Sequence, residues 1–149
     1  MFPFGQFTLK AQEAIRRAHE LALERGQNQV DVLHLFAALL LQDEGIVVSI
    51  LDRLNIDANA LIDSVLDSLD VAGSSSKVMT PSFQMMLTPD FGKILESSHK
   101  IARSMNDEYI STEHLFLAFF DMTSKAQHVL NHFRIDKNAV RNVIQELRG

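Results

Sequence analysis

The chain has 149 residues, of which 46% are hydrophobic and 22% charged, with a formal net charge of −5 and no cysteine. This length suits one domain with a sizeable core, and the weak acidity argues against a nucleic-acid or anionic-membrane partner. The absence of cysteine excludes disulfides and thiolate metal sites and fits a reducing cytosol, and the chain shows neither a secretory signal nor the roughly 20 apolar residues needed to span a bilayer.

An amphipathic helix is predicted over residues 8–25. Its apolar side chains recur at helical spacing along one face: Ala11, Ala14, Ile15, Ala18, Leu21 and Ala22. Thr8 is suited to cap the first turn through its hydroxyl group. Gly26 is placed to end the helix in a left-handed conformation.

Three further helices are predicted in the first half of the chain. The segment Leu33–Leu41 is almost entirely apolar, which indicates a helix buried on all sides, with Asp31 as its cap. A helix follows at about 46–54. The last one begins after Asp57, a second plausible cap, and runs to about Leu69.

Residues 70–86 are predicted to form a flexible connector or a surface loop, because they include Gly73-Ser-Ser-Ser76 and Pro81. The connector also contains Met79, Phe83, Met85 and Met86. We expect these apolar side chains to pack back on the domain. The alternative is an adaptable binding surface, since methionine suits varied partners.

The second half of the chain repeats the first. At a constant shift of 80, His34-Leu35-Phe36 falls on His114-Leu115-Phe116, and further on, at a shift of 79, Ile56-Asp57 falls on Ile135-Asp136. The first of the repeated helices is expected to begin at the cap Thr88, with Pro89 after it, and to end at Asn106. The second is expected over 113–120, with Ser111 or Thr112 as its cap, and the third over 125–133. The fourth is expected to run from the cap Asp136 to about Leu147. The sequence therefore predicts an all-α fold of eight helices in one domain, 1–149, with repeat one at 7–69, a linker at 70–86 and repeat two at 87–148.

Motifs for chemistry are scarce in this chain. It contains no phosphate-binding glycine loop, nucleophile elbow or H-E-x-x-H motif, and no cluster of titratable residues that predicts catalysis. His128 and His132 have the i, i+4 spacing of a metal pair, but a solvated helix face is the favoured interpretation. For His34 and His114 we expect structural roles, with the rings bonded to neighbouring backbone groups.

Glu113 differs between the two repeats. In the first turn of its helix, a negative charge offsets the helix dipole, which alone would explain an acid there. Its counterpart in the first repeat is Leu33, although the neighbouring histidine is kept. This divergence favours a role for Glu113 beyond capping.

Three segments resemble the N-terminal repeat domain of the Clp ATPases: Phe7-Thr8-x-x-Ala11-Gln12-x-Ala14, Leu33-His34-Leu35, and Asp107-Glu108-Tyr109-Ile110-Ser111-Thr112-Glu113-His114-Leu115. The resemblance extends from about residue 4 to 148. It implies two pseudo-twofold-related four-helix repeats that bind unfolded or aggregated clients and adaptor proteins. The family passes such clients to an AAA+ ring, a hexamer in the full-length cytoplasmic protein, so ATP and magnesium are expected in domains beyond residue 149 and no cofactor or metal in this chain.

The resemblance also implies site residues. In the ClpB-type disaggregases the positions of Thr8, Asp107 and Glu113 handle substrate, and all three residue types are present here. In the ClpC-type unfoldases each repeat binds phosphoarginine through a threonine and a glutamate. Thr88 with Glu113 matches that pair, whereas Thr8 would be paired with Leu33, which cannot bind a guanidinium group.

These residues favour the ClpB type, with the ClpC type as the alternative. A stand-alone accessory protein of the same fold, without a motor, is a further alternative. The end of the chain at Gly149, directly after Glu146-Leu-Arg148, favours a piece of a longer protein. In each case the chain itself is expected to bind proteins through apolar grooves with Asp107 and Glu113 at the rim, rather than to act as an enzyme.

Overall fold

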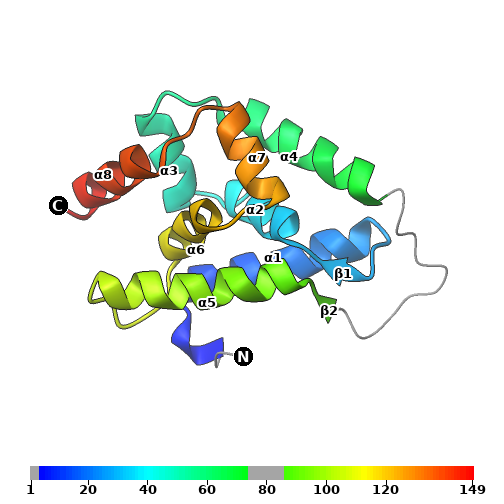
Figure 1. Ribbon diagram of the computed structural model, residues 1–149, viewed down its shortest axis with the longest axis horizontal. Helices are drawn as coiled ribbons and strands as arrows, with labels where there is room; N and C mark the ends of the chain where they lie inside the picture. Colours follow the sequence, from blue (N-terminus) through cyan, green and yellow to red (C-terminus); the bar gives the residue numbers. More distant parts are fainter. Residues whose placement is uncertain (1–3, 74–85) are drawn as a thin grey trace.

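Eight α-helices and two very short strands form the part of the computed structural model that is described, residues 4–73 and 86–149 (Figure 1). The helices are α1 (Leu9–Glu24), α2 (Val32–Leu40), α3 (Ile46–Arg53), α4 (Ala58–Gly73), α5 (Pro89–Ser104), α6 (Thr112–Ala118), α7 (Lys125–His132) and α8 (Lys137–Arg148), with 3₁₀ turns η1 (Phe4–Gln6) and η2 (Phe119–Asp121). The predicted all-α fold is confirmed. The helix α4 continues to Gly73, into the segment predicted as connector, and Met79, Phe83 and Met85 lie outside the described residues, whereas Met86 is 65% exposed.

The helix ends follow the predicted local chemistry. The hydroxyl oxygens of Thr8 and Thr88 accept hydrogen bonds from the amides of Ala11 and Phe91, each at 3.2 Å. Gly26 and Asn106 follow α1 and α5 with positive φ angles of 69° and 59°. Both predicted caps and both predicted stops are thus confirmed.

The two apolar helices α2 and α6 form the centre of the core, because every residue of each is buried. Figure 1 shows them between α1 and α5 on one side and α3, α4, α7 and α8 on the other. Phe36 of α2 packs against Phe116 of α6 and Phe119 of η2, with ring centroids 6.1 and 5.1 Å apart. One core therefore joins the two repeats.

The two repeats also exchange short extended segments. Strand β1 (Gln29–Val30) of repeat one pairs in parallel with β2 (Met86–Leu87), and Phe7 forms the equivalent bridge to Ile110. The amide of Thr8 donates to the carbonyl of Ile110 at 2.9 Å, and that of Thr88 donates to Val30 at 3.0 Å. As a result, the first helix of each repeat begins beside the second helix of the other repeat.

Candidate functional site

A cavity of about 500 Å³ lies where the repeats meet, between the start of α1, the α2–α3 loop and the start of α6. We name it the Thr8 cavity. Its lining consists of Thr8, Leu9, Lys10, Gln42, Glu44, Gly45, Ile46, Ser111, Thr112 and Glu113. Two of the predicted site residues, Thr8 and Glu113, thus share one cavity although they are 105 residues apart in the sequence.

Glu113 does not present a free carboxylate to this cavity. It is only 8% exposed, and its Oε2 accepts hydrogen bonds from Nη2 and Nε of Arg148 at 3.0 and 3.3 Å. The same Nη2 lies 2.8 Å from Oδ2 of Asp107. Arg148, the last residue of α8, therefore joins two of the predicted site residues to each other.

Asp107 has a second partner on α6. Nε2 of His114 lies 2.7 Å from Oδ2 of Asp107, while Nδ1 of His114 accepts the amide of Ser111 at 2.9 Å. Burial raises the pKa of the Asp107 carboxyl, but hydrogen bonds from Arg148 and His114 outweigh it and hold the pKa below its ordinary value. Burial by itself would lower the pKa of Arg148, but the bonds of Arg148 to Asp107 and Glu113 outweigh burial and raise this pKa above its ordinary value. Asp107 and Arg148 are thus both charged at neutral pH.

Thr88 lies apart from Glu113, at the equivalent junction of repeat one. Its hydroxyl donates to Oδ1 of Asp31 at 3.0 Å, and it lines a cavity of about 270 Å³ with Asp31, His34 and Asp90, among others. Thr88 and Glu113 therefore line different cavities, and the structure does not bring the predicted pair together in one site. The exchange of segments between the repeats places Thr8, not Thr88, beside Glu113.

The junction in repeat one has no charged cluster of this kind. His34 repeats the geometry of His114, because its Nδ1 accepts the amide of Asp31 at 2.9 Å, but its Nε2 bonds to the neutral side chain of Gln27. The amide of Gln27 in turn donates to the carbonyl of Leu69 at 3.3 Å. The bond to a neighbouring backbone group that was predicted for both histidines is confirmed.

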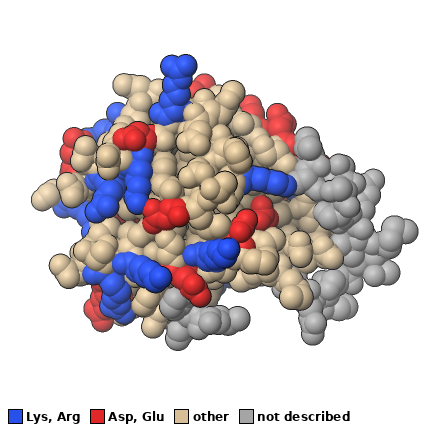
Figure 2. Space-filling model, viewed as in Figure 1, with Lys and Arg blue, Asp and Glu red and all other residues tan. Residues whose placement is uncertain are grey.

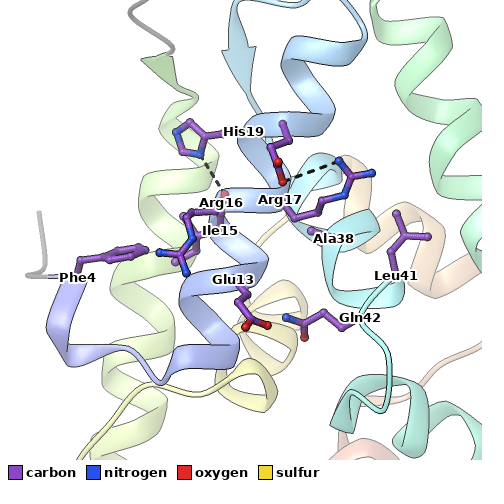
Figure 3. Close-up of a pocket in the computed structure, with 10 residues that line it drawn as sticks. Phe4, Glu13, Ile15, Arg16, Arg17, His19, Ala38, Leu41 and Gln42 are labelled. Carbon is purple, nitrogen blue, oxygen red and sulfur yellow. Dashed lines mark hydrogen bonds and ion pairs between the residues drawn. The ribbon is translucent and has the colours of Figure 1, made fainter.

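A third cavity, of about 730 Å³, lies along the other side of α1 (Figure 3). Gln42 lines both it and the Thr8 cavity. The charged groups at its edge have partners of their own: Nη1 of Arg17 lies 2.9 Å from Glu24, and Arg16 stacks 5.7 Å from the centroid of the Phe4 ring. Its exposed apolar residues are Phe4 and Leu41, each 41% exposed. Sequence reasoning missed this cavity.

No strong field of one sign covers the visible face of the molecule, because Figure 2 shows basic and acidic side chains interspersed on it. Within residues 4–73 and 86–149, no three His, Asp or Glu side chains form a group that could hold a metal ion. Across the same residues, no helix is long and apolar enough to cross a membrane.

Arg148 was also missed by sequence reasoning. It is 35 residues from Glu113, and no local spacing connects the two. The repeat offers no direct signal either, because the counterpart of Arg148 at a shift of 79 is the apolar residue Leu69, which is buried, whereas the side chain of Arg148 is 34% exposed.

Comparison with known proteins identifies relatives over nearly the whole chain. The sequence profile of the Clp repeat (R) N-terminal domain matches residues 6–146. The chaperone protein ClpB of Clostridium tetani is 32% identical over 148 residues, which cover 97% of this chain and 17% of that protein. The chain thus spans about a sixth of the length of such relatives.

Solved structures share the fold at lower identity. The Hsp104 N-terminal domain from Candida albicans superposes with a TM-score of 0.82 at 22% identity, covering 96% of this chain and 91% of that chain. The ClpV N-domain in complex with a VipB peptide gives a TM-score of 0.68 at 14% identity, covering 91% and 82%.

Proposed function

Because the chain belongs to the Clp repeat N-terminal domain family, we propose that it receives unfolded or aggregated proteins and adaptor proteins for a Clp-family unfoldase or disaggregase. The motor is a AAA+ ring encoded beyond residue 149, a hexamer in the full-length cytoplasmic protein. ATP and magnesium bind to that ring. The chain itself binds and releases clients without turnover.

The observation that carries this proposal is the apolar surface beside the Thr8 cavity. Leu9, in the first turn of α1, lines the cavity and is 74% exposed. Phe4 and Leu41 extend the exposed apolar surface along the neighbouring cavity. Exposed apolar side chains around two adjoining hollows suit the apolar segments that an unfolded chain displays. Such contacts are weak and tolerate many sequences, so a client can be released to the motor.

Thr8 and Glu113 are proposed to contact the client at the rim of the Thr8 cavity, and Asp107 is proposed to act on it indirectly. Thr8 and Glu113 line it directly. Asp107 contributes through Arg148, to which both acids bond. Thr88 is proposed as a contact in the smaller cavity of repeat one, where it lies with Asp31.

We favour a ClpB-type disaggregase over a ClpC-type unfoldase. The matching relatives from Clostridium tetani and Gloeobacter violaceus are both ClpB chaperones at 32% identity. A ClpC-type domain would bind phosphoarginine in each repeat. Here that place in repeat one is taken by Leu33, an apolar and fully buried residue, so repeat one has no acid there to hold a guanidinium group.

Docking of an adaptor or other protein is a second candidate for the same surface. One solved relative, the ClpV N-domain, is in complex with a peptide of VipB. This supports peptide recognition by the present chain. A stand-alone accessory protein that lacks a motor would use the same surface.

The proposal is tested by binding of a reduced, alkylated protein that stays unfolded, measured by calorimetry. Leu9→Asp places a charge in the apolar wall, and we expect affinity to fall about tenfold, as for the loss of one buried leucine contact. Leu23→Asp is the matched control, because Leu23 lies on the same helix and is 54% exposed. An equal loss in both variants, or no binding by the unaltered chain, would contradict the proposal.

The rim acids are tested with Asp107→Ala combined with Glu113→Ala. We expect weaker client binding, because removal of both acids leaves Arg148 unpaired at the cavity edge. Circular dichroism must first show that the double variant is folded, since both acids hold the end of α8. Unchanged affinity in a folded variant would remove Asp107 and Glu113 from the site.

A further inference from the structure

Asp107, Glu113 and Arg148 form a three-residue cluster at the edge of the Thr8 cavity, which we name the acid–arginine cluster. Arg148 lies within 3.0 Å of both carboxylates. Two carboxylates and one guanidinium leave this cluster with a net charge of −1 rather than −2. The rim of the cavity is therefore less acidic than the presence of Asp107 and Glu113 alone would indicate.

The guanidinium group of Arg148 pairs with one oxygen of each carboxylate that these acids would offer to a client. Its Nε and Nη2 both donate hydrogen bonds to Oε2 of Glu113, and Nη2 also forms an ion pair with Oδ2 of Asp107. A carboxylate binds a guanidinium through the same short, charge-assisted bonds, whichever chain supplies the arginine. An arginine of a client would meet carboxylates whose negative charge Arg148 already partly offsets.

Comparison of the two repeats shows that the three residues differ together. At the repeat shifts of 80 and 79, the counterparts of Asp107, Glu113 and Arg148 are Gln27, Leu33 and Leu69. Repeat one therefore has no charge at any of the three places, whereas repeat two has all three. Leu33 and Leu69 are buried, whereas the side chain of Arg148 is 34% exposed, so the arginine lies at the surface beside the two acids. The arginine thus belongs with the acids as their compensating charge.

We propose that Arg148 determines the charge specificity of the Thr8 cavity. By holding both carboxylates, it makes the cavity select clients for apolar and uncharged segments and removes the preference for arginine that free acids would give. This inference rests on the proposed function, because it concerns how that same cavity chooses its clients.

The test compares two probe peptides that share one apolar sequence and differ at a single central position, arginine in one and citrulline in the other. Citrulline has nearly the shape of arginine without its charge. For the unaltered chain we expect the two dissociation constants to agree within about twofold. In Arg148→Gln neither acid is paired with an arginine, although Asp107 keeps its bond to His114. We expect the arginine peptide to bind about tenfold more tightly than the citrulline peptide, as for one added charge-assisted hydrogen bond.

Two control variants separate charge from structure. Arg148→Lys keeps a cation beside the acids, so the ratio of the citrulline peptide's dissociation constant to that of the arginine peptide is expected to stay near one. Arg141→Gln removes the same charge from an exposed position of α8 and is also expected to leave the ratio near one. If circular dichroism shows that Arg148→Gln is unfolded, the double variant Arg148→Gln with Asp107→Asn takes its place. It removes one positive and one negative charge, so the cluster keeps its net charge of −1 while Glu113 no longer pairs with an arginine.

The outcomes separate this inference from the proposed function. If the ratio of the two dissociation constants stays near one in folded Arg148→Gln, or rises equally in Arg148→Lys, the proposed role of Arg148 is wrong. Either outcome leaves the proposal that the chain binds clients unaffected. Failure of the unaltered chain to bind either peptide and the unfolded protein contradicts the proposed function instead.

Discussion

At the scale of single residues, the two equivalent histidines show how one position acquires two environments. His34 and His114 both accept the backbone amide of the residue that caps their helix, at 2.9 Å. Their other ring nitrogens differ in partner, a neutral amide in Gln27 and a carboxylate in Asp107. The sequence predicted the shared backbone bond, because it depends on local spacing. It could not predict the partner of Asp107 and Glu113, because Arg148 arrives from a different helix.

The environment of His34 makes the stability of the domain depend on pH. Burial lowers the pKa of His34 to about 4, from an ordinary value near 6.5. The unfolded chain therefore binds a proton between these values that the folded chain does not, so stability falls as pH drops from about 6.5 to 4. Protonation of Nδ1 would also break its bond from the amide of Asp31. We expect a loss of about 2–3 kcal/mol over this range, measured by urea unfolding at successive pH values.

The variant His34→Asn isolates this contribution. An asparagine can still accept the capping amide through its side-chain oxygen, but it does not titrate. We expect it to be less stable than the unaltered chain at pH 7 and to have a shallower dependence of stability on pH between 6.5 and 4. A slope as steep as that of the unaltered chain would assign the effect to other groups.

At the scale of helices, the predictions succeeded where the signal is local and failed where it is not. The caps Thr8 and Thr88 and the stops Gly26 and Asn106 lie next to the helices they define, so short sequence patterns sufficed. The segment exchange consists of two-residue strands, which leave no alternating pattern to detect. Its consequence, that Thr8 rather than Thr88 meets Glu113, was therefore out of reach of the sequence.

The end of α1 provides a test in which one repeat is the reference for the other. Gly26 has a φ of 69° and Asn106, its counterpart, a φ of 59°, and both lie in the left-handed region that side chains with a Cβ disfavour. We expect Gly26→Ala to destabilise the domain by about 1 kcal/mol, because nothing else contacts an added Cβ there. Gly26→Asn places in repeat one the residue that repeat two has at this position. We expect it to destabilise the domain measurably less than Gly26→Ala, as measured by thermal unfolding. Equal costs would mean that the conformation of this residue does not limit stability.

At the scale of the whole molecule, the two repeats share a core that neither could complete alone. Phe36 of repeat one lies 5.1 Å from Phe119 and 6.1 Å from Phe116 of repeat two, and all three rings are fully buried. The exchanged segments add backbone hydrogen bonds between the repeats at two places. Loss of either repeat would expose the buried face of the other. The domain should therefore unfold in one cooperative step, although its sequence is built from two units.

Phe36→Ala tests this coupling by calorimetry. We expect a loss of about 3–5 kcal/mol from the cavity that it leaves, and a melting temperature lower by roughly 10 °C. The transition should remain single, with calorimetric and van't Hoff enthalpies in agreement, because the cavity weakens both repeats at once. Leu23→Ala, at a position 54% exposed, is the control and should change stability by no more than about 0.5 kcal/mol. Two separated transitions in Phe36→Ala would instead show that repeat two keeps its structure without the phenylalanine contact, and that the repeats fold as independent units.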